Sequence, residues 1–231
     1  MWNFNGSKEN EDTLKPLCLR VDGFFDLPPR RIYRYFATFN DSGLTHQSPD
    51  LRGLHQSFDR EEVNRLPAYL RDCFYLSDEE RGRLPLDRPF EKLVAFDDLI
   101  YITPQVCLDP ISCVITYAHE LQHLLQNHCH PDSMKDSKVL RANLGKWDSE
   151  ATDIDIPSEV DATIVSKRVA EAMYGTEEVG KFAKHQLFLI RTGNIGKSQR
   201  KKWQFFLKVS SNTEYDFVAE TKGMIARYCD H

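Results

Sequence analysis

Residues 109–129 read DPISCVITYAHELQHLLQNHC, and this stretch has the signals of one long helix. Asp109 is a residue type that caps helix N-termini, and Pro110 suits the first helical position because its missing N–H needs no partner there. Pro131 disfavours helical backbone in the residue before it. The sequence therefore predicts a helix from about Pro110 to about Cys129.

Two histidines and a glutamate lie in the middle of this helix. His119 and His123 are four residues apart, so a helix places both imidazoles on one face, one turn apart, where they can share a metal ion. Two imidazoles suit zinc, and a catalytic zinc site keeps one position open for water. Glu120 is the expected general base, because it can take a proton from that water and return it to a leaving amine. The pattern predicts a zinc metallopeptidase.

A catalytic zinc site of this kind needs a third protein ligand. The strongest candidate is Glu159, which lies 36 residues after His123 at the start of a second helix predicted over 158–174. Asp161 is expected to orient a ligand histidine through its other ring nitrogen. Four further residues remain open as alternatives for the third ligand: His128, His130, Asp153 and Asp155.

Two apolar, β-prone runs precede the motif helix. Residues 92–96 and 99–103 lie on either side of Asp97 and Asp98, which predicts a tight hairpin. The expected fold class is α+β: a zincin-like domain whose small twisted sheet, including residues 92–103, packs on the motif helix, with a helical C-terminal part. The expected organisation is a poorly assigned, partly helical region over 1–90, a zincin-like core over 91–175 and a helical extension over 176–231 that forms one compact unit with the core.

The remaining segments carry weaker patterns. The first fifteen residues are polar and are expected to be frayed, whereas 59–74 and 77–80 have the periodicity or capping of short helices. Residues 131–157 are polar and acidic, which predicts a long connection with a short helix over 139–144. Ser158 and Asp161 stand at capping-box spacing, Gly175 is expected to end that helix, and Thr176 is expected to cap another that runs to about Ile190.

The charge and the cysteine content of the chain indicate which kinds of partner and which cellular location to expect. The formal net charge is −5 over 231 residues, so the chain is not built around a phosphate-binding surface, and nucleic acid is not expected as its primary ligand. The basic cluster over 197–203 is interpreted as a solvated helix face. No signal peptide and no membrane-spanning run is recognised. The six dispersed cysteines are interpreted as reduced thiols, and a cytoplasmic location is expected.

The motif and its surroundings resemble the ImmA/IrrE family of metallopeptidases. The likeness rests on the segment from Leu99-Ile100-Tyr101-Ile102 through Tyr117-Ala118-His119-Glu120-Leu121-Gln122-His123-Leu124-Leu125, and on Glu159-Val160-Asp161-Ala162, which is similar to the family's downstream Glu-x-x-Ala element. It covers about a third of the chain. The resemblance implies a gluzincin-like site with His119, His123 and Glu159 as zinc ligands and Glu120 as base. It also implies a regulatory protease that cleaves one protein, often a DNA-binding repressor.

The function expected from these residues is a site-specific zinc endopeptidase acting on a protein or peptide, with no membrane partner. Two alternatives remain open. One is a zinc-binding regulatory module that no longer cleaves, and the other is a zinc hydrolase of a non-peptide amide. The group that would stabilise the transition state is not assigned among its candidates, Tyr117, Tyr174 and His185.

Overall fold

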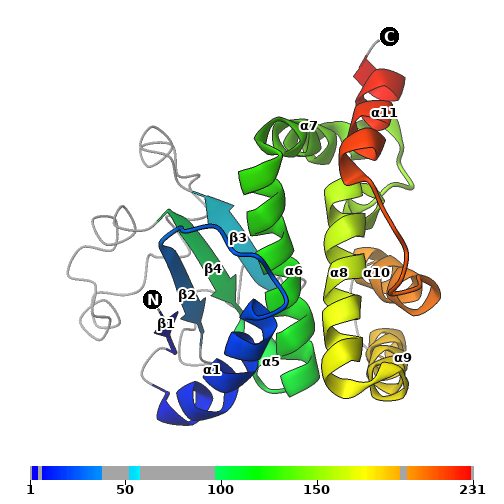
Figure 1. The fold of residues 1–231 in the computed structure, drawn as a ribbon. Coiled ribbons are helices and arrows are strands. Elements are labelled where there is room, and N and C mark those ends of the chain that lie inside the picture. The colour runs from blue at the N-terminus through cyan, green and yellow to red at the C-terminus, as the bar shows by residue number, and fades with distance from the viewer. Residues whose placement is uncertain (1, 5–6, 38–51, 58–96, 193–196, 230–231) are drawn as a thin grey trace, which may run out of the picture. The chain divides into compact units, whose positions relative to one another are not determined.

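The computed structural model describes residues 2–4, 7–37, 52–57, 97–192 and 197–229. Within these ranges the chain is α+β, largely helical, with a small mixed four-stranded sheet (Figure 1). It forms two compact units, Met1–Glu120 and Leu121–His231, and the division between them falls inside one continuous helix, α6. The helices predicted near 59–74 and 77–80 and the strand predicted over 92–96 lie outside the described residues. The predicted boundaries near 90 and 175 stay predictions.

The sheet belongs to the first unit. Its strands are β1 (Trp2–Asn3), β2 (Ile32–Phe36), β3 (Gly53–Ser57) and β4 (Asp98–Ile102), in the spatial order β1-β2-β4-β3. β1 and β4 pair with β2 in parallel, whereas β3 is antiparallel to β4. Every residue of β2 and β4 is buried, which suits strands that are covered on both faces.

The strand predicted over 99–103 is confirmed one residue earlier, as β4. Asp98 is the first residue of β4 and not a turn residue, and β4 pairs with β2 and β3 from earlier in the chain. These pairings join segments far apart in the sequence, so the local pattern around Asp97 and Asp98 could not show them.

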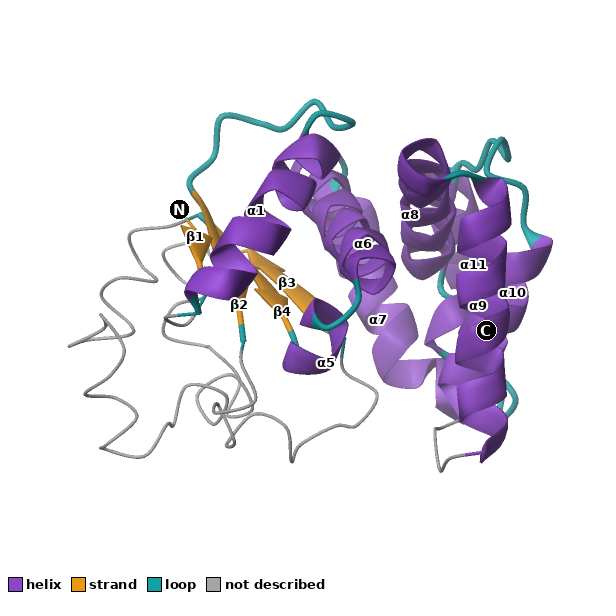
Figure 2. Cartoon of the chain, turned by 90° about the horizontal axis from the view of Figure 1, so that it is seen from below, coloured by secondary structure: helices purple, strands orange, loops and turns teal. Residues whose placement is uncertain are grey.

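Most of the described N-terminal segment is helical, so the expectation that it would be frayed is wrong there. Helix α1 (Lys8–Asp22) begins after Ser7, whose Oγ accepts a hydrogen bond from the Asn10 N–H at 3.2 Å. Three of its apolar side chains, Leu14, Cys18 and Val21, are buried, whereas Leu19 is exposed. Figure 2 shows α1 beside the strands of the sheet. A single buried stripe is enough to dock a helix on a core.

A buried polar cluster joins α1, β2 and α6. The Tyr117 hydroxyl donates to Asp22 Oδ1 at 2.7 Å and accepts from Arg34 Nε, and Arg34 Nη2 donates to Asp22 Oδ2 at 3.0 Å. The Arg34 guanidinium also lies 4.6 Å from the ring centroid of Trp2. The hydroxyl of Tyr117 therefore links α6 to α1 and β2 within the first unit.

The helix predicted over 110–129 is confirmed. α6 runs from Pro110 to Cys129, after the short helix α5 (Pro104–Cys107), and Asp109 Oδ1 accepts from the Ser112 N–H at 2.8 Å. The next segment is α7 (Pro131–Trp147), so the predicted long connection with a short helix over 139–144 is wrong. Pro131 ends α6 and then occupies the first turn of α7, where a proline is tolerated.

Helix α8 runs from Pro157 to Tyr174 after the 3-10 turn η2 (Asp153–Asp155). Ser158 lies inside α8, whose N-cap is Ile156, so Ser158 and Asp161 do not form the expected capping box. The capping box is instead made by Thr152 and Asp155. α8 ends at Gly175 as predicted, and its φ of 84° explains why glycine stands there.

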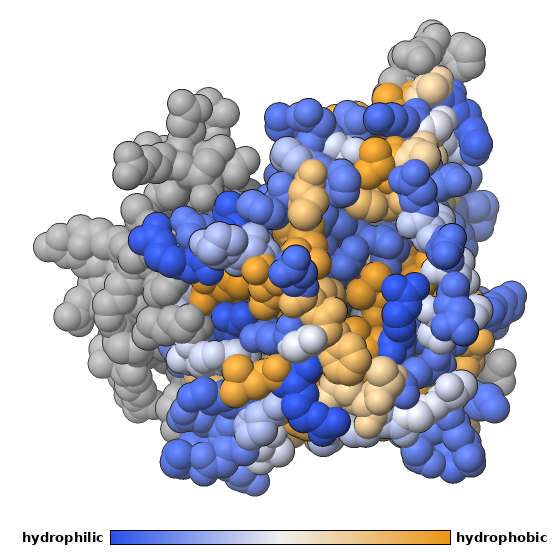
Figure 3. All heavy atoms as spheres, viewed as in Figure 1, coloured by the Kyte–Doolittle hydropathy of each residue, from blue (hydrophilic) through white to orange (hydrophobic). Residues whose placement is uncertain are grey.

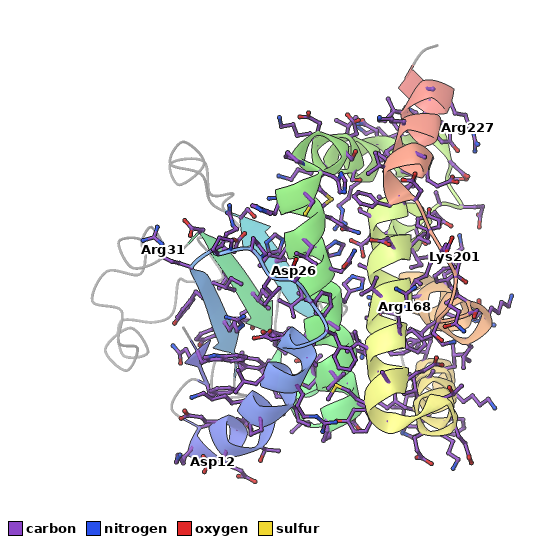
Figure 4. The ribbon with its side chains drawn as sticks, in the orientation of Figure 1. Asp12, Asp26, Arg31, Arg168, Lys201 and Arg227 are labelled. Atoms are coloured by element: carbon purple, nitrogen blue, oxygen red, sulfur yellow. The ribbon has the colours of Figure 1, made fainter. Side chains whose placement is uncertain are left out.

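Three more helices complete the second unit: α9 (Thr176–Thr192), α10 (Lys197–Lys208) and α11 (Phe217–Cys229). α9 confirms the helix predicted from Thr176. Trp203 of the basic segment points into the core and packs edge-on against Phe182 and Phe206. Lys201 and Arg168, labelled in Figure 4, donate to backbone carbonyls, Lys201 to that of Glu150 and Arg168 to that of Ser211 at 2.8 Å.

Hydrophilic residues make up most of the visible surface in Figure 3, with apolar side chains showing between them. None of the described helices combines the length and the apolar character that a membrane crossing requires.

Candidate metal centre

Two helices bring the predicted ligands together. His119 and His123 lie one turn apart on α6, and Glu159 lies in the first turn of α8. Their ligand atoms are all within 4.8 Å of one another, and His123 Nε2 is 3.2 Å from Glu159 Oε1. The two histidines are buried, and the Glu159 side chain is 12% exposed. This is the one group of three or more His, Cys, Asp or Glu residues among the described ones that can hold a metal ion.

The side chain of Gln126 fixes which nitrogen of His123 faces the centre. The Gln126 amide nitrogen donates to the Ser158 carbonyl at 3.0 Å and to Asp161 Oδ2 at 2.7 Å. Its oxygen therefore faces His123 Nδ1, 2.8 Å away, and a carbonyl oxygen can only accept. Nδ1 therefore donates to Gln126, and Nε2 points toward Glu159. In the neutral imidazole, Nε2 is then the nitrogen with the free lone pair. That is the tautomer a metal ligand needs.

Asp161 acts one step further from the centre than expected. It was predicted to contact a ligand histidine, but its Oδ2 accepts from Gln122 Nε2 and Gln126 Nε2, both at 2.7 Å. It therefore orients His123 through Gln126. Sequence reasoning missed Gln126, although its place three residues after His123 on the same helix was a usable signal.

Arg141 is a second residue that sequence reasoning missed. Its Nη2 donates to Glu159 Oε1, from a helix that had been expected to be mostly connection. A guanidinium beside the carboxylate favours the ionised form, which is the form that binds a cation. Ligating carboxylates commonly have such a hydrogen-bonding neighbour.

Glu120 lies against the edge of the sheet. Its side chain is buried, and a Cβ added to Gly53 of β3 would lie 2.8 Å from Glu120 Oε1 and 2.8 Å from Thr116 Cγ2. Only a residue without a side chain lets the backbone of β3 come this close. β3 is an edge strand among the four described strands. Its first residue, Gly53, lies beside Glu120, the expected general base.

The alternative ligands have other roles or positions. Asp155 Oδ2 accepts from the Thr152 N–H at 2.7 Å, Asp153 and His128 are exposed, and the His130 ring packs edge-on against Phe217. None of the four belongs to the metal-binding group. Tyr174 is fifteen residues beyond Glu159 on α8, roughly 22 Å along the helix, and His185 is exposed on α9.

The cysteines near α6 do not enter the centre. Within the described residues Cys18, Cys107, Cys113 and Cys129 are free thiols, and none belongs to the metal-binding group. Burial raises the pKa of the Cys107 thiol, which keeps it protonated and unsuited to metal binding.

Comparisons with known proteins supply no relative. No protein-family model matches the chain, and no curated protein and no solved structure matches it either.

Proposed function

We propose that this protein is a zinc-dependent endopeptidase whose metal ligands are His119, His123 and Glu159. The observation that carries the proposal is the hydrogen-bonded orientation of His123, which turns Nε2 toward Glu159. Two imidazole nitrogens and one carboxylate oxygen form a donor set found in catalytic zinc sites, which leave a fourth position open. A purely structural zinc site would have four protein ligands.

Zinc bound by these residues would polarise a substrate carbonyl and lower the pKa of a water molecule to near neutrality. Glu120 follows His119 directly and has little exposure to solvent. Its carboxylate is the group that accepts the proton of the attacking water and passes it to the leaving amine. Gln126 and Arg141 hold His123 and Glu159 in place, so their role is positioning.

A peptide is favoured over a non-peptide amide by the position of β3. An extended peptide can add to a strand edge through backbone hydrogen bonds, and β3 is the last strand on its side of the described sheet. Its first residue, Gly53, lies against Glu120. A strand added along β3 would thus run past the base. We propose a site-specific regulatory protease acting on a protein partner in the cytoplasm, in line with the family resemblance and with the four cysteines that are free thiols among the described residues.

The test is cleavage of a mixed library of quenched fluorescent peptides by zinc-loaded protein. Wild type should cleave some members. Glu120→Gln should bind as much zinc but lose activity by about 100-fold or more, because the proton acceptor is gone. Glu178→Gln, on the exposed surface of α9, is the matched control and should behave as wild type. Zinc binding without cleavage in wild type would support the rival reading, a regulatory module that has lost activity.

A further inference from the structure

The second unit contains a cavity of about 620 Å³, and it is separated from the proposed ligand His123 by the side chain of Gln126. Its walls come from the last turns of α6, from Asp161 of α8, and from residues 215–218 at the start of α11. Gln126 lines the cavity and also holds His123. Its volume is in the range of small-ligand sites, about 300–1,000 Å³, so it can accept a long side chain together with the adjoining backbone.

One of the polar groups in the wall of this cavity is a buried carboxylate, that of Asp161. Asp161 is 7% exposed, and its Oδ2 accepts both glutamine amides. Across the described residues, Oδ1 accepts no hydrogen bond. A buried carboxylate gains from a further donor, and a cationic donor satisfies the charge as well as the lone pair.

The other walls suit the apolar stem and the charged head of a basic side chain. Leu125, Tyr215 and Phe217 offer apolar and aromatic surface, which packs on methylene groups and attracts cations to the ring faces. Asp216 adds a second negative charge, although its Oδ1 already accepts from the Val218 and Ala219 N–H groups. No lysine or arginine lines the cavity, and the imidazole in its wall, that of His130, packs edge-on against Phe217.

We propose that this cavity is a subsite for a basic side chain of the peptide substrate, with Asp161 as the partner of its guanidinium or ammonium group. The inference rests on the proposed peptidase function. It assigns Asp161 two roles, since one oxygen orients Gln126 and the other selects the substrate. The enzyme would therefore prefer substrates with arginine or lysine near the cleaved bond.

The test is calorimetric titration of zinc-loaded protein with Nα-acetyl-arginine amide and with its neutral isostere, Nα-acetyl-citrulline amide. Wild type should bind the arginine compound at least about tenfold more tightly, because only that compound carries the charge. In Asp161→Asn the ratio should fall toward one. In Asp153→Asn, an exposed residue of η2, the ratio should remain that of wild type.

Tyr215→Leu is a second variant for the same titration, and it leaves the hydrogen bonds of Asp161 intact. It should weaken binding of the arginine compound several-fold, because it removes an aromatic face of the cavity. Equal binding of the two compounds, no binding of either, or an unchanged ratio in zinc-retaining Asp161→Asn would overturn the proposal and leave the peptidase function standing. An arginine preference in protein that cannot hold zinc would overturn the role as a substrate subsite, because the proposed function would itself have failed.

Discussion

At the scale of single residues, the orientation of His123 in the metal centre depends on Gln126, which is neither a proposed ligand nor a proposed catalytic residue. The amide nitrogen of Gln126 donates to the Ser158 carbonyl and to the Asp161 carboxylate. Its amide oxygen therefore faces His123 and accepts from Nδ1. This chain of contacts sets the tautomer of one imidazole and its direction. The motif His119-Glu120-Leu121-Gln122-His123 contains two of the proposed ligands. The residues that orient His123, namely Gln126, Ser158 and Asp161, lie outside the motif.

Replacing Gln126 by Met removes the acceptor for His123 Nδ1 while keeping the side-chain length. Zinc affinity should fall by about 10- to 100-fold, the usual effect of losing a group that orients a metal ligand. Gln122→Met is the control, because Gln122 also donates to Asp161 but makes no hydrogen bond to His123. Competition with a fluorescent chelator measures both affinities, and equal losses in the two variants would contradict the role of Gln126.

Asp98 is a buried carboxylate at the start of β4, with 1% of its side chain exposed. Burial by itself would raise the pKa of Asp98, but hydrogen bonds from His55, Arg30 and Ser57 bring it below the usual value. Its neighbour Asp97 makes an exposed ion pair with Arg31. The two residues therefore form a matched pair that differs in burial.

Asp98→Asn should lower the free energy of unfolding at pH 7 by about 1.5–3 kcal/mol, since it weakens hydrogen bonds to a charged group. Asp97→Asn should cost at most about 1 kcal/mol. Because the folded-state pKa of Asp98 is depressed, its contribution is present above the unfolded value of about 3.9 and is lost as the pH falls below it. Urea unfolding at several pH values measures this, and a wild-type advantage over Asp98→Asn that grows toward low pH would refute it.

At the scale of elements, β3 and α6 approach closely because Gly53 has no side chain. A methyl group there would meet Glu120 and Thr116 at 2.8 Å, and both belong to the helix that carries the motif. The strand edge and the base are thus positioned by one small residue.

Gly53→Ala should destabilise the protein by about 1–3 kcal/mol, the typical cost of overpacking, and should reduce peptide cleavage because β3 or Glu120 must shift. Gly145→Ala in α7 is the opposite case, because its new methyl group meets nothing within 4 Å. It should stabilise the helix by about 0.4–1 kcal/mol and leave cleavage unchanged. Unfolding curves and peptide cleavage rates for both variants test the pair. If Gly53→Ala changed neither the free energy of unfolding nor the cleavage rate, the close contact between β3 and Glu120 would not matter.

Elements with strong local signals could be predicted from the sequence. α6 begins at Pro110 after its Asp109 cap, and α8 ends at Gly175, as those residues indicate. α1 was missed because residues 8–13, with which it begins, are all polar, and the side chains that dock it, Leu14, Cys18 and Val21, come only after them. α7 was missed because Pro131 signals the end of one helix and the start of the next equally well. Strand pairing depends on contacts between distant segments, which local patterns do not contain.

At the scale of the whole molecule, the metal centre draws its ligands from two helices separated along the chain. His123 and Glu159 are 36 residues apart, and the spacing alone left four other candidates open. Arg141 could not be predicted at all, since its contact with Glu159 exists only once α7 and α8 have folded. A metal held by both α6 and α8 would stabilise the folded state over the unfolded chain.

Zinc should therefore raise the melting temperature. At a free concentration of about 100 times the dissociation constant, the stabilisation is about 2.7 kcal/mol, or roughly 5–10 °C for a chain of this size. A chelator should reverse the shift. Differential scanning calorimetry of wild type and His123→Ala checks this, and an equal response of the two proteins would mean that zinc acts elsewhere.

The measurement that tests the metal centre most directly is the zinc content of purified protein by elemental analysis, for wild type, Glu120→Gln, Glu159→Ala and the exposed-site control Glu178→Ala. The expected result is one zinc per chain in wild type, Glu120→Gln and Glu178→Ala, with a sharp loss in Glu159→Ala. Absence of zinc from wild type even after it is added back, or full retention in Glu159→Ala, would contradict the assignment of His119, His123 and Glu159 as its ligands.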